Sequence, residues 1–176
     1  MRLYNPNDPQ DELLLLNFWS HLVESNELLT VFNEAYTRVS EFFLAFRQDV
    51  LLIETDERGI WGAFWFDRSP LAGAFFSLWL RADRRHSRHS LESISAAIGF
   101  GFHDLKFRAL LVVTREPGIA KMHWRYGFQK LGLVPGLYFG DTAIVSYLTD
   151  DMFDAIATET SESAELPAPA SNGTGI

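Results

Sequence analysis

The chain has 176 residues, which fits one ordinary domain, and its hydrophobic fraction of 47% can supply a substantial core. It carries 23 acidic against 15 basic residues, a formal net charge of −8, which argues against non-specific binding of nucleic acid. There is no cysteine, so disulfides, thiolate metal sites and a cysteine nucleophile are excluded. No apolar run approaches the roughly 18–20 residues that span a bilayer, and the N-terminus lacks a secretory signal. We therefore expect a cytoplasmic protein that does not bind membranes.

The first half of the chain predicts an edge strand, two helices and three strands. Residues 1–8 indicate a short edge strand, and Asp11 and Glu12 open a helical pattern with acids in its first turn. A second helix follows, in which aromatic and aliphatic residues recur at steps of three and four from Phe32 to Phe46, a spacing typical of core packing. Three β-rich runs joined by turn residues then predict an antiparallel meander, over residues 50–54, 60–66 and 73–80.

The second half alternates helices and strands before it becomes polar. The expected elements are a helix over 91–105, a strand over 109–114, a helix over 117–126, and strands over 129–134 and 143–148. Beyond residue 153 the chain is rich in Ser, Thr, Ala, Pro and Glu and cannot bury a core of its own. The sequence thus predicts a domain over 1–153 and an acidic tail over 154–176 that is flexible or ordered by a partner.

This order of elements resembles the GNAT superfamily of N-acetyltransferases along roughly residues 1–153. The resemblance implies an α/β (α+β) fold, in which about four helices flank a mixed, mostly antiparallel sheet. It also implies that the sheet splays open between its fourth and fifth strands, which are 73–80 and 109–114 here. Acyl-CoA would enter that split, and its pantetheine arm would bond main-chain groups near Trp79 and Leu80.

The loop after the fourth strand is the most basic part of the chain, with four arginines and two histidines against one acid between Arg81 and His89. In the GNAT superfamily this loop reads Arg/Gln-x-x-Gly-x-Gly/Ala, and its amides hold the CoA pyrophosphate at a helix N-terminus. Here Arg88 replaces the first glycine. Its side chain would either block the approach of a phosphate or help to hold it by charge, and a solvated basic turn is the alternative. The resemblance implies cofactor contacts from Arg85, His86, Ser87, Arg88, His89 and Ser90.

The helix before Gly127-Phe128 would carry the proton donor. A tyrosine four residues before that glycine is common in the family, and this position is His123 here. With an unperturbed pKa of about 6.5, a histidine can protonate a leaving thiolate. Tyr126 is a second candidate donor, and the alternative for His123 is a partly exposed helix histidine.

A general base is harder to assign from the sequence. The fourth strand holds no carboxylate, and Glu54 and Asp67 are nearby candidates that are equally typical of strand ends and turns. The five histidines are scattered, so we expect no metal site.

Two functions follow from these observations. The first is an acetyl-CoA-dependent N-acyltransferase acting on a primary amine of a small molecule or protein. The second is a catalytically inactive GNAT-like structural or interaction protein, whose aromatic residues between Trp61 and Trp79 would mark a partner surface if they faced outward. The chain is also similar in size and layout to GNAT-like proteins of tailed phages, which implies a virion-associated or host-modifying role and a virion component as partner.

Overall fold

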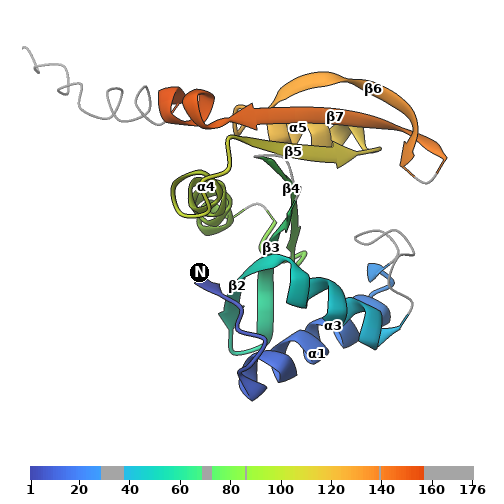
Figure 1. The fold of residues 1–176 in the computed structure, drawn as a ribbon. Helices are drawn as coiled ribbons and strands as arrows, with labels where there is room; N and C mark the ends of the chain where they lie inside the picture. Colours follow the sequence, from blue (N-terminus) through green and yellow to red (C-terminus); the bar gives the residue numbers. More distant parts are fainter. Residues whose placement is uncertain (29–37, 69–72, 86, 139, 157–176) are drawn as a thin grey trace, which may run out of the picture.

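The computed structural model describes residues 1–28, 38–68, 73–85, 87–138 and 140–156 (Figure 1). The predicted order of strands and helices is observed throughout these ranges. The start of the second predicted helix, residues 32–37, lies outside them, as do residues 29–31 before it. The elements are β1 (Arg2–Leu3), α1 (Pro9–Glu24), α3 (Val39–Gln48), β2 (Val50–Asp56), β3 (Gly59–Arg68), β4 (Gly73–Leu80), α4 (Arg88–His103), β5 (Ala109–Thr114), α5 (Pro117–Trp124), β6 (Gln129–Tyr138) and β7 (Asp141–Thr149).

Seven strands form one sheet in the order β1-β2-β3-β4-β5-β7-β6. All neighbouring pairs are antiparallel except β4 and β5, which are parallel. That parallel pairing covers only Gly73–Phe75 against Ala109–Leu111. Beyond these residues the two strands diverge, and Figure 1 shows β4 running away from the β5-β7-β6 part of the sheet. The expected splay between the fourth and fifth strands is therefore confirmed.

Helices cover both faces of the β2-β3-β4 part of the sheet. Side chains of α1 and α3 pack with one face, in a cluster that includes Leu22, Phe42 and Trp65. Residues of α4, among them Ile98, pack with the opposite face around Phe66. The helix α5 contacts β5 and β7 in the other part of the sheet.

The aromatic residues of β3 and β4 belong mainly to these two cores. Of the seven aromatic residues between Trp61 and Trp79, only Phe75 is exposed, at 41%. The other six are buried, namely Trp61, Phe64, Trp65, Phe66, Phe76 and Trp79. The outward-facing aromatic surface expected for an interaction protein is therefore absent from these two strands.

Element ends differ from the sequence prediction by a few residues. The helix α4 ends at His103 and α5 at Trp124, two residues before the predicted ends. In α5 the chain turns through Arg125 before Gly127, whose φ of +86° lies in the left-handed region that favours glycine. The strand β6 extends to Tyr138, four residues beyond the prediction, because it pairs with β7 up to the hairpin at Asp141.

The C-terminal end of the described chain is helical over 150–156 (Figure 1). The predicted domain boundary after residue 153 falls inside this segment. Ile156 lies against Gly127, where a Cβ added to the glycine would come within 2.1 Å of the Ile156 Cδ1 atom. None of the helices in the described ranges is long and apolar enough to cross a membrane.

Candidate cofactor and catalytic site

The open edge of β4 presents main-chain groups to the split in the sheet. The amide of Arg81 donates to the carbonyl of Trp61 on β3 at 2.8 Å. In the antiparallel register of β3 and β4 these two residues face each other, so the hydrogen-bonded positions alternate back along β4. The main-chain N–H and C=O groups of Trp79 consequently bond β3, whereas those of Leu78 and Leu80 point toward the split. Of the two predicted backbone contacts, Leu80 lies at the open edge and Trp79 does not.

The helix α4 starts where the chain leaves this edge. Ser87 caps it, and the Ser87 side chain accepts from the amide of Ser90 at 3.1 Å. The amide of Leu91 is bonded to the Ser87 carbonyl at 3.3 Å. The amides of Arg88 and His89 in the first turn have no acceptor within the helix. These two first-turn amides and the helix dipole thus offer a place for a phosphate beside the end of β4.

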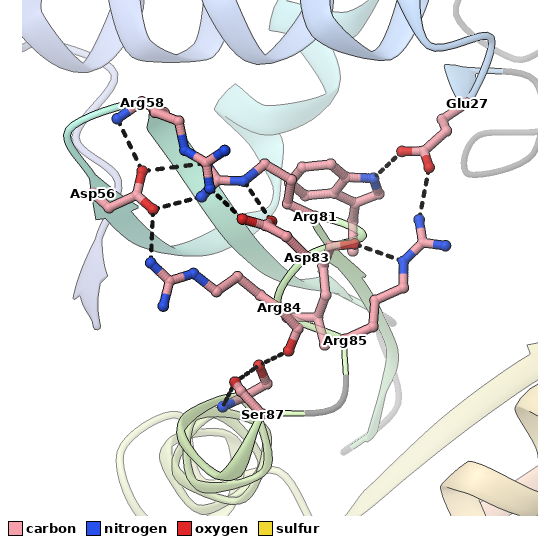
Figure 2. A network of polar contacts seen from close by, with 11 residues as sticks. Glu27, Asp56, Arg58, Arg81, Asp83, Arg84, Arg85 and Ser87 are labelled. Atoms are coloured by element: carbon pink, nitrogen blue, oxygen red, sulfur yellow. Dashed lines mark hydrogen bonds and ion pairs between the residues drawn. The ribbon is translucent and has the colours of Figure 1, made fainter.

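Acidic side chains neutralise most of the arginines of the basic loop (Figure 2). Arg81 forms a two-point ion pair with Asp56, and its Nε donates to Asp83 at 2.9 Å. Arg84 reaches the same Asp56 carboxylate at 3.1 Å. Only 11% of the Arg81 side chain and 18% of the Asp56 side chain are exposed. The Arg81 guanidinium is the main cause that holds the pKa of Asp56 far below its usual range.

Arg85 joins three segments of the molecule. Its Nε donates to the Leu80 carbonyl at 2.9 Å, and its Nη2 lies 2.7 Å from the Glu27 carboxylate. The other oxygen of Glu27 accepts from Trp79 Nε1 at 2.7 Å. Arg85 therefore bonds the Leu80 carbonyl at the open edge of β4 and links it to Glu27, which follows α1 in the chain.

Arg88 points away from the helix N-terminus. Its side chain is 92% exposed and bonds Glu92, one turn further along α4, at 2.8 Å. In this conformation Arg88 does not cover the free amides of the first turn. The φ of Arg88 is not positive, so the backbone does not require the glycine that is common in the superfamily at this place. The ring of His89 lies 5.2 Å from that of Trp61, and His86 is outside the described residues.

The two predicted proton donors lie at the end of α5 and in the turn that follows. His123 is buried, at 8% exposure, and its Nδ1 has no hydrogen-bond partner in the described structure. Burial lowers its pKa to about 4, so its imidazole is neutral at pH 7. The hydroxyl of Tyr126 is also buried without a partner, and burial raises its pKa, which keeps it protonated. Proton donation by either residue stays a prediction, and His123 would have to act from its neutral form.

Neither candidate base faces the split. Glu54 lies on β2, where its carboxylate accepts from Ser93 Oγ at 2.8 Å and pairs with the Met1 ammonium at 3.0 Å. Asp67 is exposed on β3 opposite Phe75, at the end of β4 that still pairs with β5. Among the described residues, no three His, Asp or Glu side chains gather as a metal ion would require.

Sequence reasoning missed the acids that control this loop. No local pattern in the sequence singles out Asp56, Asp83 or Glu27 as partners of these arginines. An aspartate at the β2–β3 turn and another just after β4 were the available signal, because antiparallel pairing brings the start of β3 next to the end of β4.

Comparisons with known proteins identify the fold. No family model and no curated protein matches the chain. Among solved structures, ribosomal-protein-S5-alanine acetyltransferase from Vibrio fischeri is 14% identical with a TM-score of 0.68, covering 85% of this chain and 92% of that one. Spermidine N-acetyltransferase from Vibrio cholerae, solved with CoA and spermine, is 13% identical with a TM-score of 0.67, covering 83% and 94%. RimJ from Mycobacterium smegmatis, solved with CoA-disulfide, is 9% identical with a TM-score of 0.53, covering 64% and 61%. The chain has the GNAT fold.

Proposed function

We propose that this protein is an acetyl-CoA-dependent N-acyltransferase that acts on a primary amine of a small molecule or protein. The observation that carries the proposal is the continuity of two features: the open main-chain edge of β4, at Leu78 and the amide of Leu80, leads directly to the first-turn amides of Arg88 and His89. A pantetheine arm is a chain of amides that matches an open strand edge, and a pyrophosphate matches a helix N-terminus. Binding of CoA together with spermine by the Vibrio cholerae spermidine N-acetyltransferase supports the same pairing of ligands.

Acyl-CoA would supply the activated acyl group, and the chain's own residues would hold it. The strand edge and the helix amides would fix the ligand, so that an amine in the same cleft attacks the thioester carbonyl without a large entropy cost. The C–S bond breaks as the C–N bond forms, the amine loses a proton to water or a base, and the thiolate takes one. Tyr126 is the better matched donor of that proton, since its hydroxyl stays protonated and has no other partner.

A catalytically inactive GNAT-fold interaction protein is the second candidate. Two observations favour it: acids neutralise Arg81, Arg84 and Arg85, and no carboxylate lies on the open edge of β4. A phage origin and a virion partner would belong to this alternative. Calorimetric titration with acetyl-CoA and with CoA separates the two functions. Saturable micromolar binding supports the transferase, and the absence of heat at millimolar ligand contradicts it.

A proline at position 88 tests the helix amides directly. Arg88 is the first residue of α4 and follows an extended Ser87, so proline fits there and removes only one amide donor and the side chain. Arg88→Ala is the matched control, because it removes the same side chain and keeps the amide. We expect Arg88→Pro to bind acetyl-CoA about tenfold more weakly than Arg88→Ala, the value of roughly one charge-assisted hydrogen bond. Equal affinities of the two variants would mean that the Arg88 amide does not bind the phosphates of acetyl-CoA.

A further inference from the structure

A partly buried carboxylate, that of Asp56, lies beside the basic loop where the β2–β3 turn meets the loop after β4. Asp56 ends β2, and its two oxygens receive Arg81, Arg84 and the amide of Arg58, the last at 2.9 Å (Figure 2). Arg58 and Asp83 extend the network at the surface, where the Arg58 guanidinium pairs with Asp83. The β2–β3 turn and the loop after β4 are therefore joined by alternating charges.

The network continues from Asp56 into the first turn of α4. The carbonyl of Arg84 accepts from the amide of Ser87 at 3.0 Å and from the hydroxyl of Ser90. The guanidinium of the same Arg84 lies over the Trp61 ring, 5.7 Å from its centroid, and bonds Asp56. Arg84 thus connects the Asp56 carboxylate to the cap of the helix.

We propose that Asp56 is a positioning residue of the cofactor site, which holds the loop 81–85 so that the first-turn amides of α4 face the split. The inference rests on the proposed function for its ligand, but its geometry concerns the protein alone. It assigns the arginines of this loop to the support of the backbone rather than to direct neutralisation of phosphates. Asp56 is then required for binding an anion although it is itself an anion.

The direction in which one substitution changes the affinity for acetyl-CoA distinguishes these two roles. Asp56→Asn removes a negative charge next to the loop with little change in size. If the loop attracted acyl-CoA by its charge, the variant would bind the anionic ligand more tightly. If Asp56 positions the loop, the variant binds acetyl-CoA about tenfold more weakly, since small displacements of binding groups are costly. The loss should remain the same between low and moderate salt, because it does not come from screened charge.

Glu92→Gln is the matched control. Glu92 is also an acid near the N-terminus of α4, but it is 57% exposed and bonds the outward-pointing Arg88. Its amide variant should bind acetyl-CoA at least as tightly as the wild type. Asp83 lies at the exposed end of the network, with 43% of its side chain exposed, so Asp83→Asn should lose less affinity for acetyl-CoA than Asp56→Asn. It replaces Asp56→Asn in the test if that variant does not fold.

Hydrogen exchange of the ligand-free protein provides a readout that does not need the cofactor. The hydrogen-bonded amides of Ser87, Ser90 and Leu91 should exchange several-fold faster in Asp56→Asn than in Glu92→Gln, while the β5–β7 core is unchanged. Unchanged exchange together with equal or tighter binding in Asp56→Asn overturns the positioning role. Failure of the wild type to bind acetyl-CoA or CoA overturns the proposed function instead, and the exchange data then decide whether Asp56 holds the helix start.

Discussion

Lowering the pH from 7 to 4 is expected to destabilise the protein by about 3 kcal/mol through His123 alone. In the fold, burial lowers the His123 pKa to about 4, whereas in the unfolded chain the value returns to about 6.5. Between these two values the unfolded state binds a proton that the folded state does not. Stability therefore falls as the pH falls through this window, and the contribution is fully present above the unfolded pKa.

Thermal unfolding of the wild type and of His123→Phe across this pH range measures the effect. Phenylalanine fills a similar volume beside Phe128 and does not titrate, so the variant should not show this part of the stability loss at acidic pH. For a domain of this size the difference is about 6–12 °C in the shift of Tm between pH 7 and 4. His103→Gln, a change at a 58% exposed histidine, should retain the wild-type profile. An equal decrease in Tm between pH 7 and 4 in wild type and His123→Phe would show that His123 is not the buried titrating group.

Gly101→Ala is expected to destabilise the protein by about 1–2 kcal/mol, although alanine is the better helix former. A Cβ at position 101 of α4 would lie 2.7 Å from Cε1 and 3.2 Å from Cζ of Phe66. Phe66 is fully buried between α4 and the sheet, so its ring cannot move aside without disturbing the core. The close approach of α4 to β3 thus depends on the absence of a side chain at Gly101.

Gly99→Ala is the control for this change in the same helix. Its added Cβ would meet the Phe153 ring at 3.6 Å, an ordinary contact. Removing a helix glycine there should stabilise the protein by about 0.5–1 kcal/mol. Chemical denaturation of both variants checks the prediction, and effects of the same sign would mean that the Phe66 contact does not limit α4.

The proposed site was only partly predictable from the sequence. The order of elements predicted the loop that opens α4, and the resemblance to the GNAT superfamily implied the position of the split; the structure contains both. The sequence named Trp79 and Leu80 for the backbone contacts, and strand alternation decides that of the two only Leu80 turns its main-chain groups toward the split. The sequence left His123 open between a proton donor and a partly exposed helix histidine, and the structure shows that its side chain is buried.

By itself the sequence determined the strands and helices and the order that defines the GNAT fold. Hydrophobic period, turn residues and helix caps are local signals, and they are present within ten or so residues of each element. Only the tertiary structure decided which charges of the basic loop are free. Glu27 is 58 residues from Arg85 in the chain, and Asp56 is 25 residues from Arg81, yet both pairs are in hydrogen-bond contact. Ion pairing depends on separations of a few ångströms, which arise only when the β2–β3 turn, the end of α1 and the loop before α4 pack together.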